Sequence, residues 1–239
     1  MATETWSRLE RLAIVPCHAV WNMSGDPFSD KSWYLQPFQS GEPPFYVEHI
    51  RSALCSADPK ELVVFSGGQT NAAAGPRAEA QGYWLIAERL QLWASKDVRS
   101  RSTTEDFARD SYENLLYSIC RFWECTSRYP TRIRVYGWKF KRSRFTDCHR
   151  AAIRFPLEMF EYIGVNDPSD LEAAQCGEKQ ALAQWAEDAH GVGFLLSDKR
   201  RRRNPFRRYH PYTTSCRGLA KLLAWDGSSF PTDPLPWAT

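Results

Sequence analysis

Short runs of apolar and β-branched residues alternate along this chain with longer segments in which apolar residues recur at helical spacing. The runs at residues 12–15, 62–65 and 133–138 have the length and composition of buried strands. Helical periodicity predicts helices at residues 45–57, 77–92, 108–125 and 146–162, the last interrupted at Pro156, and a more polar helix at 170–190. This alternation is typical of an α/β fold whose parallel sheet carries helices on both faces.

Three other segments lack this periodicity. Residues 22–44 are rich in turn formers and aromatic residues, and an irregular loop of about 20 residues in a compact domain is usually a lid or a binding segment. Residues 95–105 are a polar stretch between predicted helices, and residues 193–196 are predicted as a short strand or hinge. With no repeat and no low-complexity linker, we expect an α/β domain over residues 1–168 and a C-terminal helical and basic extension, 169–239, packed on it.

Composition narrows the class of protein. The chain has 239 residues, 43% hydrophobic and 25% charged, which excludes collagen-like and disordered classes. No apolar run approaches the roughly 20 residues that a membrane span needs, and residues 1–11 lack an apolar signal core. Seven scattered cysteines without a C-x-x-C pair favour reduced thiols over a disulfide framework or a zinc site. We therefore expect a soluble cytoplasmic protein with no membrane partner and no metal.

Three segments follow the predicted strands and meet at their carboxyl ends, where open parallel sheets bind ligands. Gly67 and Gly68 follow the second strand, and their backbone N–H groups at positive φ could cradle a phosphate or carboxylate, although a plain tight turn fits equally well. His18 follows the first strand and could act as a general base or simply cap the strand end. Lys141 follows the third strand and supplies positive charge.

Later polar residues add candidates to this site. His149 and Arg150 would suit an anionic ligand, or would lie on a helix surface. Residues 109–114 form a dense polar cluster at a helix start, where Asp110 or Ser111 is the expected cap and either Glu113 or Asn114 is expected to point into the fold.

The basic run at residues 199–208 has two interpretations. With Phe206, Tyr209 and Tyr212 it resembles a nuclear-import or nucleic-acid patch, and a nuclear location would follow. The net charge is only +3, however, so packing on an acidic face is the favoured interpretation and nucleic acid is not the expected partner. Metalloprotease, P-loop and α/β-hydrolase motifs are missing from the sequence.

Four motifs in order resemble one known family. They are S-G-G-x-T at 66–70, A-E-A at 78–80, T-x-E-x-x-A-R-D-S-Y-E-N at 103–114 and F-K-x-x-R-F-x-x-x-H-R-A at 140–151. Together they resemble the domain of unknown function 218 family, the YdcF-like proteins, and in particular its fungal cytosolic branch, over roughly residues 12–168. The resemblance implies a Rossmann-like three-layer sandwich with one polar pocket, and S-adenosylmethionine as a candidate ligand because a bacterial relative binds it.

Carried over residue by residue, the resemblance and the motifs predict the site. The expected catalytic residues are His18, Glu113 and His149. The expected ligand-binding residues are Ser66, Gly67, Gly68, Thr70, Glu79, Arg109, Asn114, Lys141, Arg144 and Arg150.

Three hypotheses for the function remain open at this point. The first is a small-molecule-binding protein, most simply an enzyme, that acts on a nucleotide-like or otherwise anionic ligand. The second is a non-catalytic adaptor that binds a macromolecule through its basic tail and an aromatic loop containing Trp21, Phe28, Trp33, Tyr34 and Phe38. The third is a phosphoryl- or acyl-transfer hydrolase with Cys17 or Ser66 as nucleophile and His18 as base.

Overall fold

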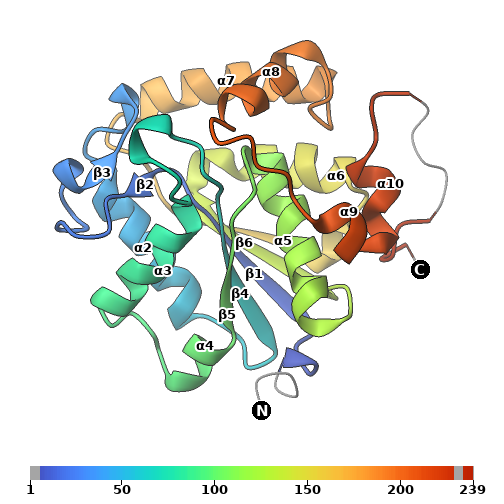
Figure 1. The fold of residues 1–239 in the computed structure, drawn as a ribbon, viewed down its shortest axis with the longest axis horizontal. Helices are drawn as coiled ribbons and strands as arrows, with labels where there is room; N and C mark the ends of the chain where they lie inside the picture. The colour runs from blue at the N-terminus through green and yellow to red at the C-terminus, as the bar shows by residue number, and fades with distance from the viewer. Residues whose placement is uncertain (1–5, 229–233, 239) are drawn as a thin grey trace.

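A five-stranded parallel sheet forms the centre of the molecule (Figure 1). The computed structural model describes residues 6–228 and 234–238. The strand order is β5-β4-β1-β6-β7, so the chain starts in the middle of the sheet and fills one half before crossing to the other. The strands are β1 (Arg11–Pro16), β4 (Glu61–Ser66), β5 (Ser102–Glu105), β6 (Arg132–Trp138) and β7 (Phe160–Asn166). The Rossmann-like α/β sandwich predicted from the sequence is confirmed.

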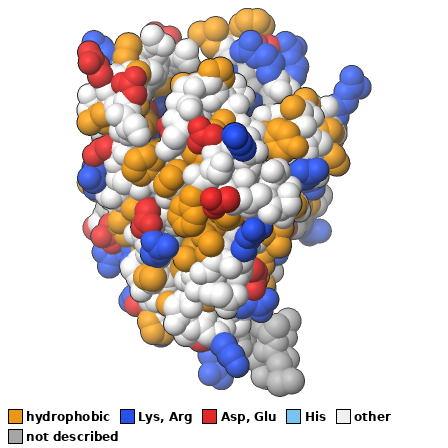
Figure 2. All heavy atoms as spheres, turned by 90° about the vertical axis from the view of Figure 1, so that its left-hand side faces the viewer, with side chains coloured by type: hydrophobic (Ala, Val, Ile, Leu, Met, Phe, Trp, Pro, Cys, Tyr) orange, Lys and Arg blue, Asp and Glu red, His pale blue; other side chains and the backbone are white. Residues whose placement is uncertain are grey.

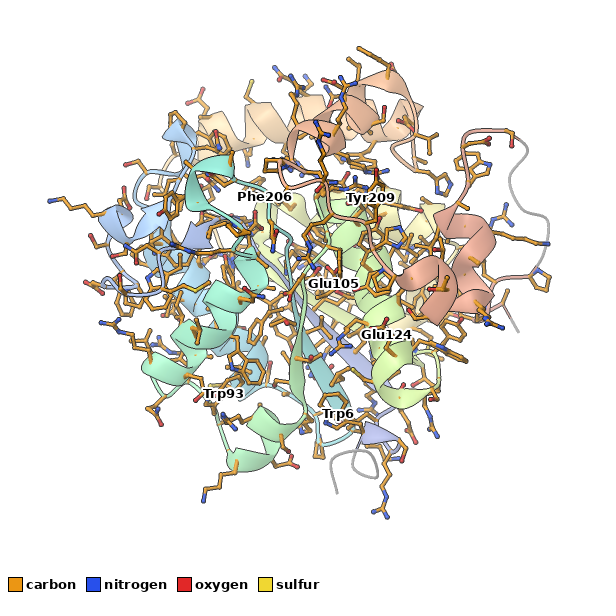
Figure 3. The ribbon with its side chains drawn as sticks, viewed as in Figure 1. Trp6, Trp93, Glu105, Glu124, Phe206 and Tyr209 are labelled. Carbon is orange, nitrogen blue, oxygen red and sulfur yellow. The ribbon has the colours of Figure 1, made fainter. Side chains whose placement is uncertain are left out.

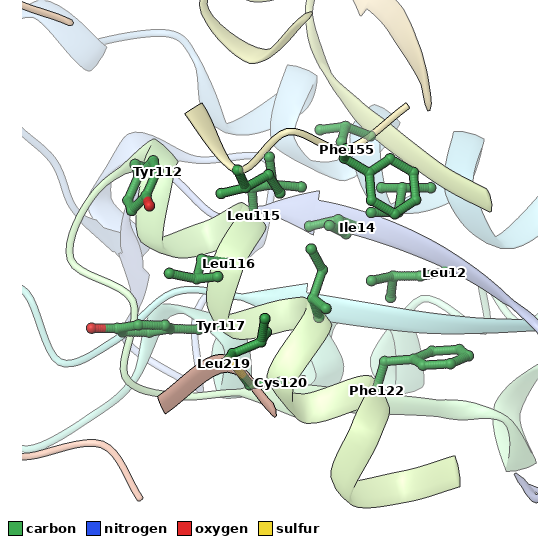
Figure 4. Close-up of a cluster of buried hydrophobic side chains, with 14 of the residues drawn as sticks. Leu12, Ile14, Tyr112, Leu115, Leu116, Tyr117, Cys120, Phe122, Phe155 and Leu219 are labelled. Carbon is green, nitrogen blue, oxygen red and sulfur yellow. The ribbon is translucent and has the colours of Figure 1, made fainter. Parts of the chain in front are cut away.

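The central strands are apolar on both faces because helices cover both sides of the sheet. Leu12 and Ile14 of β1 point into one core layer, and Ala13 and Val15 point into the other. Helix α5 (Ser111–Thr126) covers the first layer, which Figure 4 shows in close-up. Helices α2 (Pro43–Cys55) and α3 (Glu79–Arg89) cover the second.

The predicted helix over residues 146–162 is wrong. The segment begins with a π-helical turn at Arg144–His149 and one short helix, α6 (Arg150–Ala152), and then enters the edge strand β7. Pro156 cannot donate a helical hydrogen bond, and Arg154 before it has φ of 51°, so the helix stops there. The aromatic and β-branched residues beyond Pro156 then pair with β6.

Two more segments differ from the sequence-based prediction. The polar residues 95–105 contain helix α4 (Lys96–Ser100) and strand β5, which is the other edge of the sheet. Residues 193–196 do not form a strand or hinge, because they enter helix α8 (Phe194–Arg202).

The loop at 22–44 holds part of a small antiparallel pair, β2 (Val20–Trp21) with β3 (Trp33–Tyr34). Trp21 and Trp33 are buried in the core, whereas Phe38 is 77% exposed, so the aromatic residues of the adaptor hypothesis do not share one surface. On the face that carries α2, α3 and this hairpin, charged groups of both signs are interspersed with apolar ones (Figure 2).

The C-terminal extension packs on the α/β domain in two places. Helices α7 (Leu171–Glu187) and α8 lie beyond the carboxyl ends of the strands (Figure 1). The short helices α9 (Tyr212–Ser215) and α10 (Ala220–Leu223) follow. Trp185, Tyr212 and Trp237 are buried in the same core layer as α5. Of the helices that the structure describes, none combines the length and apolar character needed to cross a membrane.

Candidate functional site

Two adjoining cavities lie at the carboxyl ends of the central strands, under α7 and α8. The first, of about 340 Å³, is lined mainly by polar side chains and is called the polar lobe. The second, of about 530 Å³, includes Trp138, Phe140 and Ala174 in its wall and is called the apolar lobe. Seven residues line both lobes, which makes them two parts of one site: His18, Phe38, Gln39, Lys141, Arg144, Lys199 and Arg203.

Four cationic side chains are common to the two lobes. Arg144 forms an ion pair with buried Glu178, with 3.0 Å between Nε and Oε1. Within the described part of the chain, no carboxylate lies within ion-pair distance of Lys141, Lys199 or Arg203. Burial and the neighbouring Arg144 lower the pKa of Lys141 to about 7. Burial and Arg203 lower the pKa of Lys199 to about 8, so these cations destabilise one another's charged forms.

His18 lines both lobes at the end of β1, as the sequence predicts. Its ring packs against Tyr46 at 5.3 Å between centroids, near Trp138 at 6.0 Å. Burial, reinforced by Lys141, lowers the pKa of His18 well below its usual value, so the imidazole is neutral at pH 7. Among the described residues its Nε2 has no hydrogen-bond partner.

Thr70 and Glu79, two of the predicted ligand-binding residues, both line the polar lobe. Thr70 follows β4 and its hydroxyl donates a hydrogen bond to Glu79, the first residue of α3. Burial raises the pKa of Glu79, and the Thr70 hydroxyl, Arg203 and Lys141 oppose this shift.

The predicted anion cradle at Gly67 and Gly68 is wrong. The Gly67 N–H donates to the Glu105 carbonyl at 3.0 Å and the Gly68 N–H to the Ala108 carbonyl at 2.7 Å. Neither glycine has a positive φ. Glycine is needed for close packing instead, because a Cβ on Gly68 would lie 2.7 Å from the Ala108 carbonyl oxygen.

Ser66 lies behind the wall of the polar lobe and positions Asn114. It is fully buried, its hydroxyl donates to Glu105 Oε2 at 2.8 Å, and its carbonyl accepts from Asn114 Nδ2 at 2.8 Å. Asn114 itself lines the lobe. Burial raises the pKa of Glu105, which is labelled in Figure 3, to about 7.

Glu113, a predicted catalytic residue, lines neither lobe. Its carboxylate accepts from the backbone N–H and the guanidinium of Arg109, at 2.8 and 2.9 Å, and from the Tyr117 hydroxyl at 3.0 Å. Arg109 does line the polar lobe, but with its charge already paired. Asp110 caps α5 and forms an ion pair with Arg200 at 2.6 Å.

His149 and Arg150 also lie outside the lining of both lobes. Arg150 donates to the carbonyls of Thr146 and Phe155, at 2.8 Å each, and so holds the turn after the π-helical segment. His149 is fully buried, with Nε2 2.7 Å from the Ser111 hydroxyl. It contacts Ser111, which does line the polar lobe.

Two further cations of the site, Lys199 and Arg203, were not predicted from the sequence. They lie four residues apart at the end of α8, so one helix face presents both to the lobes. The basic run at residues 199–208 contained the signal that could have found them, because residues four apart along a helix share one face. Arg201 and Arg202 point outward instead, with side chains 78% and 73% exposed.

Within the part of the chain that the structure describes, no group of three or more His, Cys, Asp or Glu residues is placed to hold a metal ion. The hydrolase hypothesis took Cys17 or Ser66 as the nucleophile and His18 as the base, but neither nucleophile is hydrogen-bonded to His18. The Cys17 thiol donates to the Val15 carbonyl at 3.6 Å, and burial raises its pKa. The Ser66 hydroxyl bonds Glu105 rather than His18.

Comparisons with known proteins place the chain among its relatives. No family model matches the sequence, and no solved structure matches it either. The resemblance to the domain of unknown function 218 family therefore stays a prediction. The chain is 31% identical over 261 residues to the "Uncharacterized protein YOR238W" of Saccharomyces cerevisiae, an alignment that covers 84% of this chain and 86% of the yeast protein. The chain thus belongs to the same family as this yeast protein.

Proposed function

We propose that this protein binds an anionic, nucleotide-like small molecule in the two-lobed site. The observation that carries the proposal is the convergence of Lys141, Lys199 and Arg203 on one cavity without carboxylate partners among the described residues. Buried like charges are costly, and a bound anion offsets that cost. Burial and neighbouring arginines lower the pKa values of Lys141 and Lys199, and the carboxylates of Glu178, Glu42 and Asp110 oppose these shifts only in part.

The two lobes suit different parts of one ligand. A phosphate or carboxylate group fits beside the shared cations, with Asn114 and Thr70 able to bond hydroxyl groups. A planar or apolar group fits the apolar lobe against Trp138 and Phe140. Volumes of about 340 and 530 Å³ are in the range of small-molecule sites. S-adenosylmethionine carries a net positive charge, so the cations favour a phosphate-bearing nucleotide over it.

Native mass spectrometry of the purified protein tests this proposal. ATP, a sugar nucleotide and S-adenosylmethionine are added separately, and we expect adducts with the first two. The Arg203→Ala variant should weaken nucleotide binding about tenfold or more, because one charge-assisted contact is lost. Arg202→Ala, at the last residue of α8 directly before Arg203 and facing solvent, is the matched control and should bind as the wild type does.

Two outcomes would contradict the proposal. One is a folded protein that forms no adduct with any phosphate-bearing probe. The other is nucleotide binding that Arg202→Ala weakens as much as Arg203→Ala, because the attraction would then come from general surface charge.

A further inference from the structure

Ser111 and His149 form a hydrogen-bonded pair at the wall of the polar lobe. The Ser111 hydroxyl lies 2.7 Å from His149 Nε2, which is the distance expected between an activated nucleophile and its base. Ser111 is half-buried and lines the lobe, whereas His149 is fully buried behind it. A reactant in the lobe could therefore reach the hydroxyl while the imidazole stays protected from water.

The surroundings of His149 hold its ring in one orientation. Trp185 of α7 packs edge-on against it at 4.5 Å, and Phe145 does so at 5.4 Å. Within the described residues His149 Nδ1 has no partner, and burial lowers the pKa of the ring to about 3. The ring is thus neutral, and with the proton on Nδ1 its Nε2 is free to accept the hydroxyl proton. The negative charge of Asp110 favours the imidazolium that would form, whereas the charges of Arg144 and Arg200 oppose it.

Ser111 is also the first residue of the 16-residue helix α5. The N–H groups of Glu113 and Asn114 bond the side chain and the carbonyl of Asp110. For the N–H groups of Ser111 and Tyr112, no acceptor is found in residues 6–228 and 234–238. Backbone donors at a helix N-terminus stabilise an oxygen that gains negative charge next to the nucleophile.

We propose that Ser111 is the nucleophile and His149 the general base of an acyl-transfer site that hydrolyses a carboxylic ester bearing negative charge. This inference rests on the proposed function, because the cations of the lobes would hold the charged end of the substrate. Ser111 Oγ bonds the ester carbonyl carbon and its proton passes to His149 Nε2. The bond from that carbon to the leaving oxygen breaks, and the leaving group takes the proton. Water then hydrolyses the acyl-serine and restores the hydroxyl.

The test uses the full chain and the 4-nitrophenyl half-ester of succinic acid, whose free carboxylate matches the cations. Intact-mass and peptide mass spectrometry should find one succinyl group on Ser111, with release of nitrophenolate. Ser111→Ala should abolish this labelling, and His149→Ala should slow it about a hundredfold or more. Ser118→Ala is the control, because Ser118 lies on the same helix with a buried hydroxyl that has no partner among the described residues.

The results separate this inference from the proposed function. Acylation that spares Ser111, or that His149→Ala leaves unchanged, overturns the dyad even if nucleotides still bind. In a third outcome, Ser111 is acylated, Arg203→Ala does not slow the acylation, and the protein binds no nucleotide. This outcome supports the dyad and contradicts the proposed anion site. Thermal melting checks each fold, and if His149→Ala does not fold, Ser111→Ala decides alone, since its side chain lies at the cavity wall.

Discussion

Lys141 is a lysine whose charge depends on pH within the physiological range, because burial and Arg144 lower its pKa to about 7. Glu178 and Glu42 oppose this shift and Arg203 adds to it. The protonated fraction falls as pH rises through this pKa, so anion binding should weaken about tenfold or more between about pH 6 and pH 9.

Isothermal titration with sulfate measures this dependence, since the charge of sulfate is constant over that range. Lys141→Met should bind weakly at every pH and leave only the smaller dependence that Lys199 contributes, because the pKa of Lys199 is about 8. Lys139→Met is the matched control, as its ammonium pairs with Asp167 outside the site. Wild-type affinity that stays flat with pH would contradict the assignment.

Individual residues of the site could be predicted where their position in the chain is enough to bring them to the site. His18 and Lys141 follow strands, so their arrival at the carboxyl edge of the sheet needed only the strand predictions. Glu113 and His149 are on the right elements, but their side chains are held by Arg109 and Ser111. Glu113 is held by a partner four residues away and His149 by one 38 residues away, so chain position alone does not decide which way a side chain turns.

Two glycines in the site region should respond oppositely to alanine. Gly68→Ala places a Cβ 2.7 Å from the Ala108 carbonyl and should lower the free energy of unfolding by about 1–3 kcal/mol. Gly177→Ala lies inside α7, where a Cβ would meet no described atom within 4 Å beyond the helix's own backbone, and should raise it by about 0.5–1 kcal/mol. Urea denaturation followed by circular dichroism measures both. A stabilising effect of Gly68→Ala would remove the packing role given to that glycine.

The long amphipathic helices and the buried strands were predicted, whereas short edge elements were missed. α5 has a strong apolar face, and the structure differs from its predicted range only at the ends. β5 reads Ser-Thr-Thr-Glu and carries little hydrophobic signal, yet it pairs with β4 because its neighbours place it there. After His149, the helix ends before Pro156, and the chain then enters strand β7.

Arg200 joins the C-terminal extension to the α/β domain. Its guanidinium pairs with Asp110 at 2.6 Å and donates to the Gly191 carbonyl at 2.9 Å, with both charged side chains largely buried. Arg200→Met leaves the Asp110 carboxylate buried without this partner, so the free energy of unfolding should fall by about 3–5 kcal/mol.

Chemical denaturation with urea measures this effect, and Arg201→Ala is the matched control. Arg201 pairs with Asp198, but its side chain is 78% exposed, so its loss should change stability by about 1 kcal/mol or less. Equal effects of the two substitutions would mean that Arg200 does not anchor α8. If Arg200→Met destabilises the protein and Arg201→Ala does not, the packing of α8 over the site depends on the buried ion pair between Arg200 and Asp110.

The sequence by itself determined the parallel α/β class and the edge of the sheet at which polar residues gather. Those features follow from periodicity and from chain order, which are local properties. Only the tertiary structure decided that α8 brings Lys199 and Arg203 over the end of β1 and next to Lys141. It also decided that Ser111 lines the cavity beside His149, whereas the N–H groups of Gly67 and Gly68 are bonded to backbone carbonyls. Contacts between segments far apart in the sequence have no signature in local pattern, because packing of the whole chain sets them.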